Sequence, residues 1–177
     1  MKITKTNING VYVVERNKLA DMRGYFSRMA DVSLLKEAGM CADFVQVNLS
    51  QCINKGTLRG MHSQLHEAAE DKLVSCTRGA IYDVCVDVRQ GSPTFGQYIG
   101  EILSEENGKA LYVPKGFAHG YLSLTDDSQA LYFVTQYYTP GAEKGYRFDD
   151  PAFSIAWPLP PPYIISDKDL SWPLLGG

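Results

Sequence analysis

Alternation of apolar and polar residues, interrupted by turn residues, is the feature that most limits the folds open to this chain. Residues 44–50 and 81–88 alternate strictly with a period of two, as the residues of a β-strand do. Glycine, proline, asparagine and aspartate separate further strand-like runs, at positions 91–93, 107–108, 126–127 and 140–141. Many short strands with almost no helix predict an all-β barrel or jelly roll with few short helices.

One segment carries the signals of a helix. Asp31 is a good N-cap, residues 32–38 follow it, and Gly39 ends the segment. Before this helix the pattern predicts two strands, at 10–15 and 23–28, joined by a polar loop.

Residues 44–50 have two distinct faces. One face is apolar and the other polar, with Val45, Val47 and Leu49 opposing Gln46, Asn48 and Ser50. Such alternation is typical of a half-buried strand.

Residues 81–88 place two acids on one strand face, beside Ile81 and Cys85. A carboxylate on a strand needs water or a partner. We expect water to solvate Asp87, whereas Asp83, between two apolar neighbours, is expected to need a partner.

The bulk properties of the chain describe one ordinary globular domain, residues 1–177. Hydrophobic residues make up 45% of the 177 residues, and the net charge of −3 provides no basic field for nucleic acid. No apolar run approaches the ~20 residues of a membrane span, and no signal peptide is visible, so we expect a cytoplasmic protein. The four cysteines lack Cys-x-x-Cys spacing, which favours reduced, mostly buried thiols.

The stretch from Gly56 to Lys72 contains many of the side chains that can bind ligands or transfer protons. In an extended strand His62 and Gln64 share one face, while Arg59 lies on the other. For each residue alone, a polar side chain on an edge strand is the simpler explanation. Their combination in one apolar-flanked segment indicates a functional site.

Two later segments also bear on the fold and the site. The proline-rich residues 157–162 cannot pair as a central strand and predict an extended segment over the barrel. After them, residues 166–169 place two acids and a lysine where they can return to the barrel mouth.

Pro114 to His119 has the Pro-x-Gly-x-x-His form of the second motif of cupin jelly rolls. Metal-binding cupins carry His-x-His in their first motif, whereas this chain has His62-Ser63-Gln64. An amide in place of an imidazole makes a weak metal site, so we expect no metal.

Several segments, in order along nearly the whole chain, resemble the dTDP-4-dehydrorhamnose 3,5-epimerase family. They are Gln46–Ser50, Leu58–Gln64, Lys72–Val74, Gly79–Val84, Ser92–Gly96, Pro114–Gly120, Asp150–Pro151 and Ser166–Asp169. The resemblance implies a cupin-like double-stranded β-helix that acts as a cofactor-independent epimerase and is a homodimer. Its substrate would be a nucleotide-diphospho-4-keto-6-deoxy sugar.

The resemblance also implies roles for individual residues. His62 resembles the general base, Asp169 its carboxylate partner, Tyr132 the acid on the opposite sugar face and Lys72 the group near the ketone oxygen. The positions that match substrate-binding residues are Arg23, Phe26, Gln46, Asn48, Arg59, His119, Glu143 and Lys168.

The chemistry accounts for these residue types independently. A C–H beside a ketone is acidic because its anion delocalises onto oxygen, so catalysis needs a base at carbon and a donor at oxygen. His62 and Lys72 suit those roles. Inversion needs a proton from the other face, and a tyrosine hydroxyl with a reference pKa of about 10 can supply it. A guanidinium fork such as that of Arg59 suits a diphosphate.

The chain departs from the family pattern at three places. Arg28 stands where the family commonly has a nucleotide-contacting carboxylate, Ser63 replaces an aromatic residue, and residues 65–70 are atypical. The default substrate is dTDP-4-dehydro-6-deoxyglucose, and Arg28 leaves open another base, such as cytosine. Inversion at C3, C5 or both also remains open.

Two other functions compete with the epimerase. A metal-dependent cupin oxygenase would need ligands that Gln64 does not supply. A sugar-binding module without catalysis would not need to retain His62, Lys72, Tyr132 and Asp169.

Overall fold

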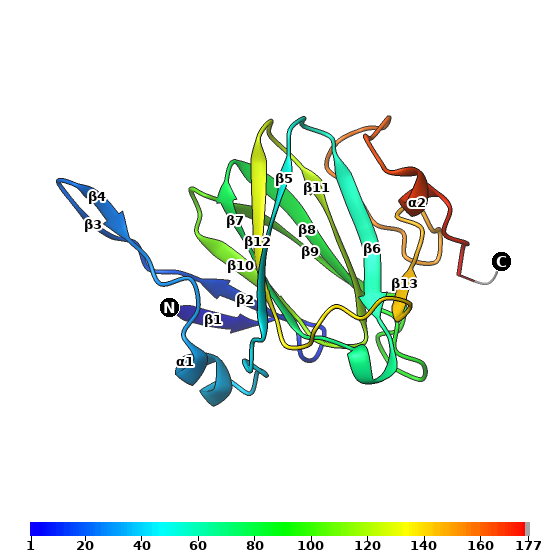
Figure 1. Cartoon of the computed structure of the whole chain (residues 1–177), viewed down its shortest axis with the longest axis horizontal. Coiled ribbons are helices and arrows are strands. Elements are labelled where there is room, and N and C mark those ends of the chain that lie inside the picture. Colours follow the sequence, from blue (N-terminus) through cyan, green and yellow to red (C-terminus); the bar gives the residue numbers. More distant parts are fainter. Residues whose placement is uncertain (176–177) are drawn as a thin grey trace.

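Two antiparallel β-sheets pack face to face in the computed structural model, which describes residues 1–175. In spatial order the first sheet contains β1 (Lys2–Lys5), β2 (Tyr12–Glu15), β10 (Lys109–Val113), β7 (Lys72–Arg78), β12 (Ser128–Val134) and β5 (Gln46–Cys52). The second contains β13 (Glu143–Gly145), β6 (Leu58–Gln64), β11 (Phe117–Ser123), β8 (Ala80–Asp87) and β9 (Tyr98–Ser104). This architecture confirms the predicted all-β jelly roll (Figure 1).

The two sheets are close together along one side and enclose a core there. Strand β9 contacts both β7 and β10 of the opposite sheet. The enclosed side chains are apolar and almost fully buried, among them Val74, Cys76, Ile81, Cys85 and Leu111. Because β8 also buries Val84 and Val86 on its outer face, under Tyr146 and Phe153, this strand is covered on both sides.

The burial of Asp87 corrects the expectation that water solvates it. Its side chain is fully buried at the end of β8, where it accepts hydrogen bonds from Arg89, Ser92 and Thr94. Burial alone would raise its pKa, but these donors outweigh burial and hold the pKa of Asp87 well below its usual range. Asp83 is buried as well and has the expected partner, which belongs to the pocket described below.

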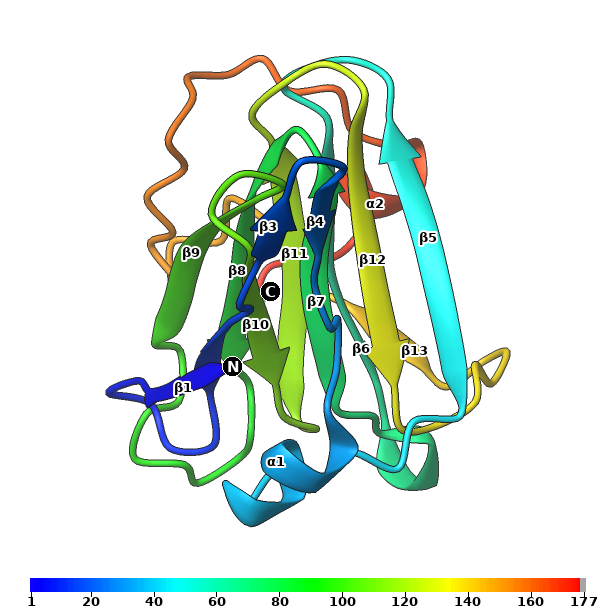
Figure 2. The same cartoon turned by 90° about the vertical axis from the view of Figure 1, so that its left-hand side faces the viewer.

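Helix α1 (Val32–Glu37) forms where the sequence predicts it. The carboxylate of Asp31 accepts the backbone N–H of Leu34, and Gly39 adopts a positive φ of +88° after the last turn. Leu35 packs against Leu73 on the outer face of the first sheet. Figure 2 shows α1 covering one end of that sheet.

A hairpin that the sequence analysis missed projects from the body of the protein. Strand β3 (Leu19–Asp21) pairs with β4 (Gly24–Phe26), and the predicted polar loop therefore contains a strand. Figure 1 shows this hairpin extending away from both sheets. The side chains of Leu19, Met22 and Phe26 are exposed, so the hairpin buries no core of its own within the described chain.

Strand β5 lies at the edge of the first sheet with its apolar face outward. Val45, Val47 and Leu49 are exposed, whereas Gln46 and Asn48 are half-buried and face the interior. The predicted alternation is correct, but the buried face is the polar one. A polar interior face is expected where a strand borders a binding pocket rather than a core.

The C-terminal part of the chain covers the second sheet. The proline-rich segment forms no strand, and Trp157 packs edge-on against Tyr82 with ring centroids 6.0 Å apart. The short helix α2 (Asp167–Leu170) follows and begins at Ser166, whose side chain accepts the N–H of Asp169. No helix among residues 1–175 is long and apolar enough to cross a membrane. All four cysteines are free, and three are buried.

Candidate active site

Two adjoining hollows of about 280 Å³ and 330 Å³ lie between the sheets and share His62, Lys72 and Tyr132. Together they collect ten of the twelve site residues that the sequence analysis named. His62 comes from β6 of the second sheet, whereas Lys72 and Tyr132 come from β7 and β12 of the first. The hollows therefore form one pocket with an imidazole on one wall and an ammonium and a phenol on the other. We call it the central pocket.

His62 and Asp169 form a hydrogen-bonded pair. Nε2 of His62 lies 2.6 Å from Oδ1 of Asp169, and Oδ2 of the same carboxylate accepts the backbone N–H of Gly60 at 3.1 Å. Asp169 is only 4% exposed. Burial alone would raise its pKa, but the bonds from His62 and Gly60 outweigh burial and lower the pKa of Asp169. The buried carboxylate therefore stays ionised and orients the ring.

Gly60 allows β6, which carries His62, to approach β11 closely. Its φ is +112°, and a Cβ at this position would lie 2.6 Å from Cα of Gly120 and 2.7 Å from the carbonyl oxygen of His119. Only glycine fits so close to β11. The close approach of β6 to β11 aligns His62 opposite His119 in the strand register.

Lys72 and Tyr132 share the opposite wall with an acid that the sequence analysis missed. Nζ of Lys72 lies 3.1 Å from Oε1 of Glu70, and both side chains are nearly buried. Burial raises the pKa of Tyr132 and the charge of Glu70 raises it further, while Arg59 opposes them. Tyr132 is therefore held as a neutral phenol, the form that can donate a proton.

His119 has its own carboxylate partner on the neighbouring strand. Its Nε2 lies 2.8 Å from Oδ1 of Asp83, which is fully buried. The pairing of β11 with β8 sets the register that brings the two together. The sequence signal for this partner was the position of Asp83 between two apolar residues on its strand face.

The remaining predicted binding residues surround these groups. Gln46 and Asn48 line the larger hollow from β5, and Arg59 lines the smaller one from β6. Glu143 pairs with Lys168 and lies 4.0 Å from Nδ1 of His62. Sequence reasoning gave no role to several further pocket residues besides Glu70, among them Ser50, Tyr121 and Tyr138. Of these, Ser50 and Tyr121 share a hydrogen bond.

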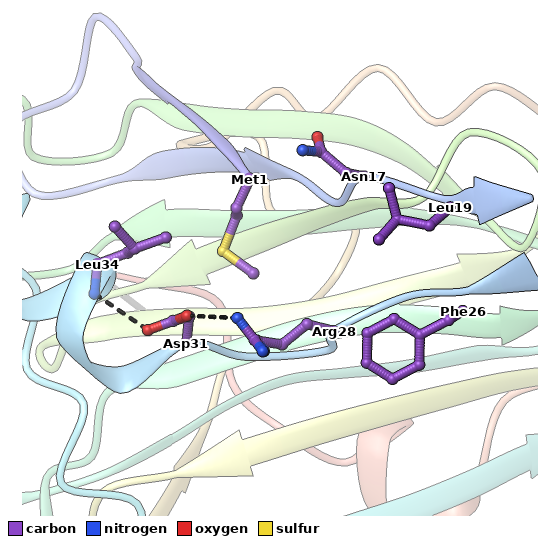
Figure 3. A pocket seen from close by; sticks show the side chains of 7 residues that line it. All are labelled: Met1, Asn17, Leu19, Phe26, Arg28, Asp31 and Leu34. Atoms are coloured by element: carbon purple, nitrogen blue, oxygen red, sulfur yellow. Dashed lines mark hydrogen bonds and ion pairs between the residues drawn. The ribbon is translucent and has the colours of Figure 1, made fainter.

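Two predicted binding residues lie outside the central pocket. Arg23 and Phe26 sit on the projecting hairpin, where Arg23 pairs with Asp21 at 2.6 Å. Figure 3 shows Phe26 beside Arg28 in a separate, largely apolar hollow, with Arg28 directed at Asp31. The guanidinium Nη1 of Arg28 lies 3.0 Å from Oδ2 of Asp31. Because Asp31 also caps α1, the guanidinium of Arg28 is tied to the start of that helix.

The side-chain amide of Gln64 is used in hydrogen bonds within the protein. Its amide nitrogen donates to the carbonyls of Ala68 and Tyr137, and its oxygen accepts the N–H of Thr139. Among residues 1–175 no group of three or more His, Cys, Asp and Glu side chains is placed to hold a metal ion.

The central pocket can move protons on two faces of a bound molecule. With Nε2 directed at Asp169, Nδ1 of His62 is the nitrogen left to accept a proton. Tyr132 offers a phenol from the other sheet, and the ammonium of Lys72 can donate to an oxygen that gains charge.

Comparison with known proteins gives one consistent result. Residues 5–176 match the family model of dTDP-4-dehydrorhamnose 3,5-epimerase. The chain is 43% identical over 175 residues to the enzyme of that name from Sinorhizobium fredii, covering 99% of this chain and 90% of that one.

Solved structures agree with the sequence comparison. The dTDP-4-dehydrorhamnose 3,5-epimerase of Bacillus anthracis, solved with TDP and PPi bound, superposes with a TM-score of 0.94 at 40% identity, covering 98% of this chain and 99% of that one. The dTDP-6-deoxy-D-glucose-3,5-epimerase of Legionella pneumophila, in complex with dTDP-4-keto-L-rhamnose, gives the same TM-score and identity over 99% and 93%. The chain therefore belongs to the dTDP-4-dehydrorhamnose 3,5-epimerase family.

Proposed function

We propose that this protein epimerises dTDP-4-dehydro-6-deoxyglucose at C3 and C5 to give dTDP-4-dehydrorhamnose. One observation carries the proposal: the His62–Asp169 pair faces Tyr132 across a pocket that also holds Lys72. Inversion at carbon requires a base and an acid on opposite faces of the sugar, and the two sheets supply one each. The pocket draws on residues from 46 to 169, which supports the treatment of 1–177 as one domain.

The first step is removal of a proton beside the C4 ketone. Nδ1 of His62 takes the proton, and the C–H electron pair moves through the new C=C bond onto the carbonyl oxygen. Asp169 stabilises the imidazolium that results, at 2.6 Å from Nε2. Lys72 donates a hydrogen bond to the enolate oxygen, where the negative charge develops.

The second step returns a proton to the same carbon from the other side. The electron pair on the enolate oxygen restores the ketone while the carbon takes the proton of Tyr132. The phenolate then recovers a proton from water and His62 loses its own, so the enzyme ends unchanged. No redox partner is needed, because substrate and product have the same composition.

The cationic side chains at the pocket rim suit the nucleotide diphosphate. Arg59 and Lys168 are exposed beside His119, and a guanidinium fork matches phosphate oxygens. The relative from Bacillus anthracis, solved with TDP and PPi, supports this use of the pocket.

The protein also acts, in this proposal, as a homodimer. Arg23 and Phe26 lie on the hairpin, away from the central pocket of their own chain. Strand β5 is the edge strand of its sheet, and its apolar side chains are exposed. A second copy would cover the exposed Val45, Val47 and Leu49 and would bring hairpin residues to a pocket. Sedimentation equilibrium tests this: a 39 kDa species supports the dimer, and a 19.6 kDa species at micromolar concentration contradicts it.

We assign the protein to the cytoplasm. Its four cysteines are free thiols, and three of them are buried. Free thiols are typical of a reducing compartment.

A panel of substrates in D₂O tests the reaction and the nucleotide together. The enzyme is incubated with dTDP-, CDP-, UDP- and GDP-linked 4-keto-6-deoxy sugars, and deuterium at C3 and C5 is followed by NMR. We expect fast exchange at both carbons of the dTDP sugar. Preference for the CDP sugar would assign Arg28 a role in base selection, exchange at one carbon would make the protein a monoepimerase, and binding without exchange would make it a sugar-binding module.

A further inference from the structure

Glu70 is the charged residue of the central pocket that neither the family pattern nor the proposed mechanism uses. It lies in the atypical segment 65–70 and lines the larger hollow beside His62, Lys72 and Tyr132. Its carboxylate is 3.1 Å from the ammonium of Lys72, and its side chain is only 11% exposed. We propose that Glu70 is a positioning residue for epimerisation, which fixes the Lys72 ammonium where the enolate oxygen forms.

The backbone around Glu70 is anchored firmly enough for that role. The next residue, Asp71, accepts hydrogen bonds from the hydroxyls of Tyr112 and Thr135 and from the N–H of Lys115. Its own N–H donates to the hydroxyl of Thr135 at 2.8 Å. These bonds join the start of β7 to β10 and to the end of β12, so Glu70 and Lys72 enter the pocket from a fixed point.

The ion pair with Glu70 restricts the Lys72 side chain and balances its charge. An ammonium on a long flexible side chain has many conformations, and only some of them donate to one oxygen. Lys72 is 14% exposed, and a nearly buried charge without a partner is costly. The carboxylate of Glu70 attracts the ammonium at 3.1 Å, restricts its direction and leaves N–H groups for substrate.

The charge of Glu70 also acts on Tyr132, whose pKa is raised by burial first and by Glu70 second, against Arg59. Other titratable groups around Tyr132 are His62 on β6, Lys72 on β7, His119 and Tyr121 on β11, Tyr138 after β12, Glu143 on β13, and Lys168 and Asp169 on α2. All of these are unchanged when Glu70 alone is replaced. Removal of its negative charge makes phenolate less unfavourable, so the pKa of Tyr132 falls and the acid form is lost at lower pH.

The inference rests on the proposed roles of Lys72 and Tyr132, and the test compares Glu70→Gln with wild type on the dTDP sugar. Gln keeps the shape and removes the charge. We expect kcat to fall about tenfold with KM changed less than about threefold, because a misdirected donor weakens the transition state more than binding. We also expect the alkaline limb of the pH profile to move to lower pH. Glu67→Gln is the matched control, because Glu67 lies on the same segment but is exposed outside the pocket, and it should behave as wild type.

A double-mutant cycle separates positioning from a general loss of structure. In a Lys72→Ala background, Glu70→Gln should change the rate of deuterium uptake less than twofold, since the group it positions is gone. Glu70→Asp keeps the charge one methylene further back, so it should lower kcat less than Gln and leave the alkaline limb in place. If Glu70→Gln does not fold, as judged by thermal unfolding, Glu70→Asp takes its place in the cycle.

Each remaining result decides against the inference. The inference is overturned if the kcat of Glu70→Gln stays within twofold of wild type, or if only KM rises. It is also overturned if Glu70→Gln still lowers the rate tenfold in the Lys72→Ala background. If the Asp variant takes over, an unchanged kcat overturns it too. Absence of deuterium exchange in the wild type would instead overturn the proposed function, and with it this inference, before any variant is compared.

Discussion

Replacement of Asp169 by Asn tests the hydrogen-bonded pair at the centre of the pocket. Oδ2 of Asp169 accepts the N–H of Gly60, so the oxygen of Asn would take this place and its NH₂ group would face His62. Nε2 of His62 must then accept, which puts the ring proton on Nδ1. The nitrogen that should take the substrate proton would already carry one.

The magnitude follows from two contributions. Loss of a hydrogen bond to a charged group costs about 1.5–3 kcal/mol, which is about a 10- to 150-fold loss in rate. A wrong tautomer adds to this, and in a serine protease triad the corresponding Asp-to-Asn change costs about 10⁴-fold. Because the Gly60 N–H dictates the orientation of the amide here, we expect kcat to fall by about 10³- to 10⁴-fold.

The assay is the rate of deuterium uptake at C3 of the dTDP sugar, with saturating substrate. Asp167→Asn is the matched control, since Asp167 is exposed on the same helix and should leave the rate unchanged. Urea unfolding checks that the fold persists in both variants. An Asp169→Asn enzyme within threefold of the wild-type rate would show that the carboxylate does not orient the base.

Three further predictions concern Lys72, metal independence and acid stability. Lys72→Ala should lower kcat about 10²- to 10³-fold because it removes the donor to the enolate oxygen, and a loss of only a few-fold would make Lys72 peripheral. EDTA should leave activity unchanged, and activity lost and then restored by a divalent ion would support the oxygenase-like metal site instead. Asp87→Asn should destabilise the fold by about 2–3 kcal/mol at pH 7 in urea unfolding. Because the folded-state pKa of Asp87 lies below the unfolded value of about 3.9, this difference should close as pH falls below about 4, and a constant difference would contradict it.

Local pattern predicted most of the strands and the first helix, but it missed β3 and did not determine which face of a strand is inside. The alternation at 44–50 was read correctly, yet Val47 and Leu49 face outward. Polar residues such as Gln46 point inward because a pocket, not a core, lies behind β5. Alternation with a period of two shows that a strand has two different faces, but only the tertiary structure decides which face is buried.

Partners distant in sequence could not be predicted from spacing. His62 and Asp169 are 107 residues apart, and only the family resemblance connected them. Asp87 was misjudged because its three donors follow the strand, and the turn signal at 91–93 does not show that their side chains reach back to Asp87. Glu70 was missed because a glutamate two residues before a lysine resembles any surface charge pair, and only burial distinguishes it.

Deuterium uptake by the His62→Asn variant tests the central claim most directly. Asn preserves a polar side chain on β6 but cannot act as a base near neutral pH. The experiment incubates wild type and variant with dTDP-4-dehydro-6-deoxyglucose in D₂O and follows C3 and C5 by NMR, after unfolding curves show that both are folded. We expect uptake at both carbons with the wild type and at neither with the variant. Uptake by His62→Asn at a rate near that of wild type would show that another group removes the proton, and it would contradict the role of the central pocket described here.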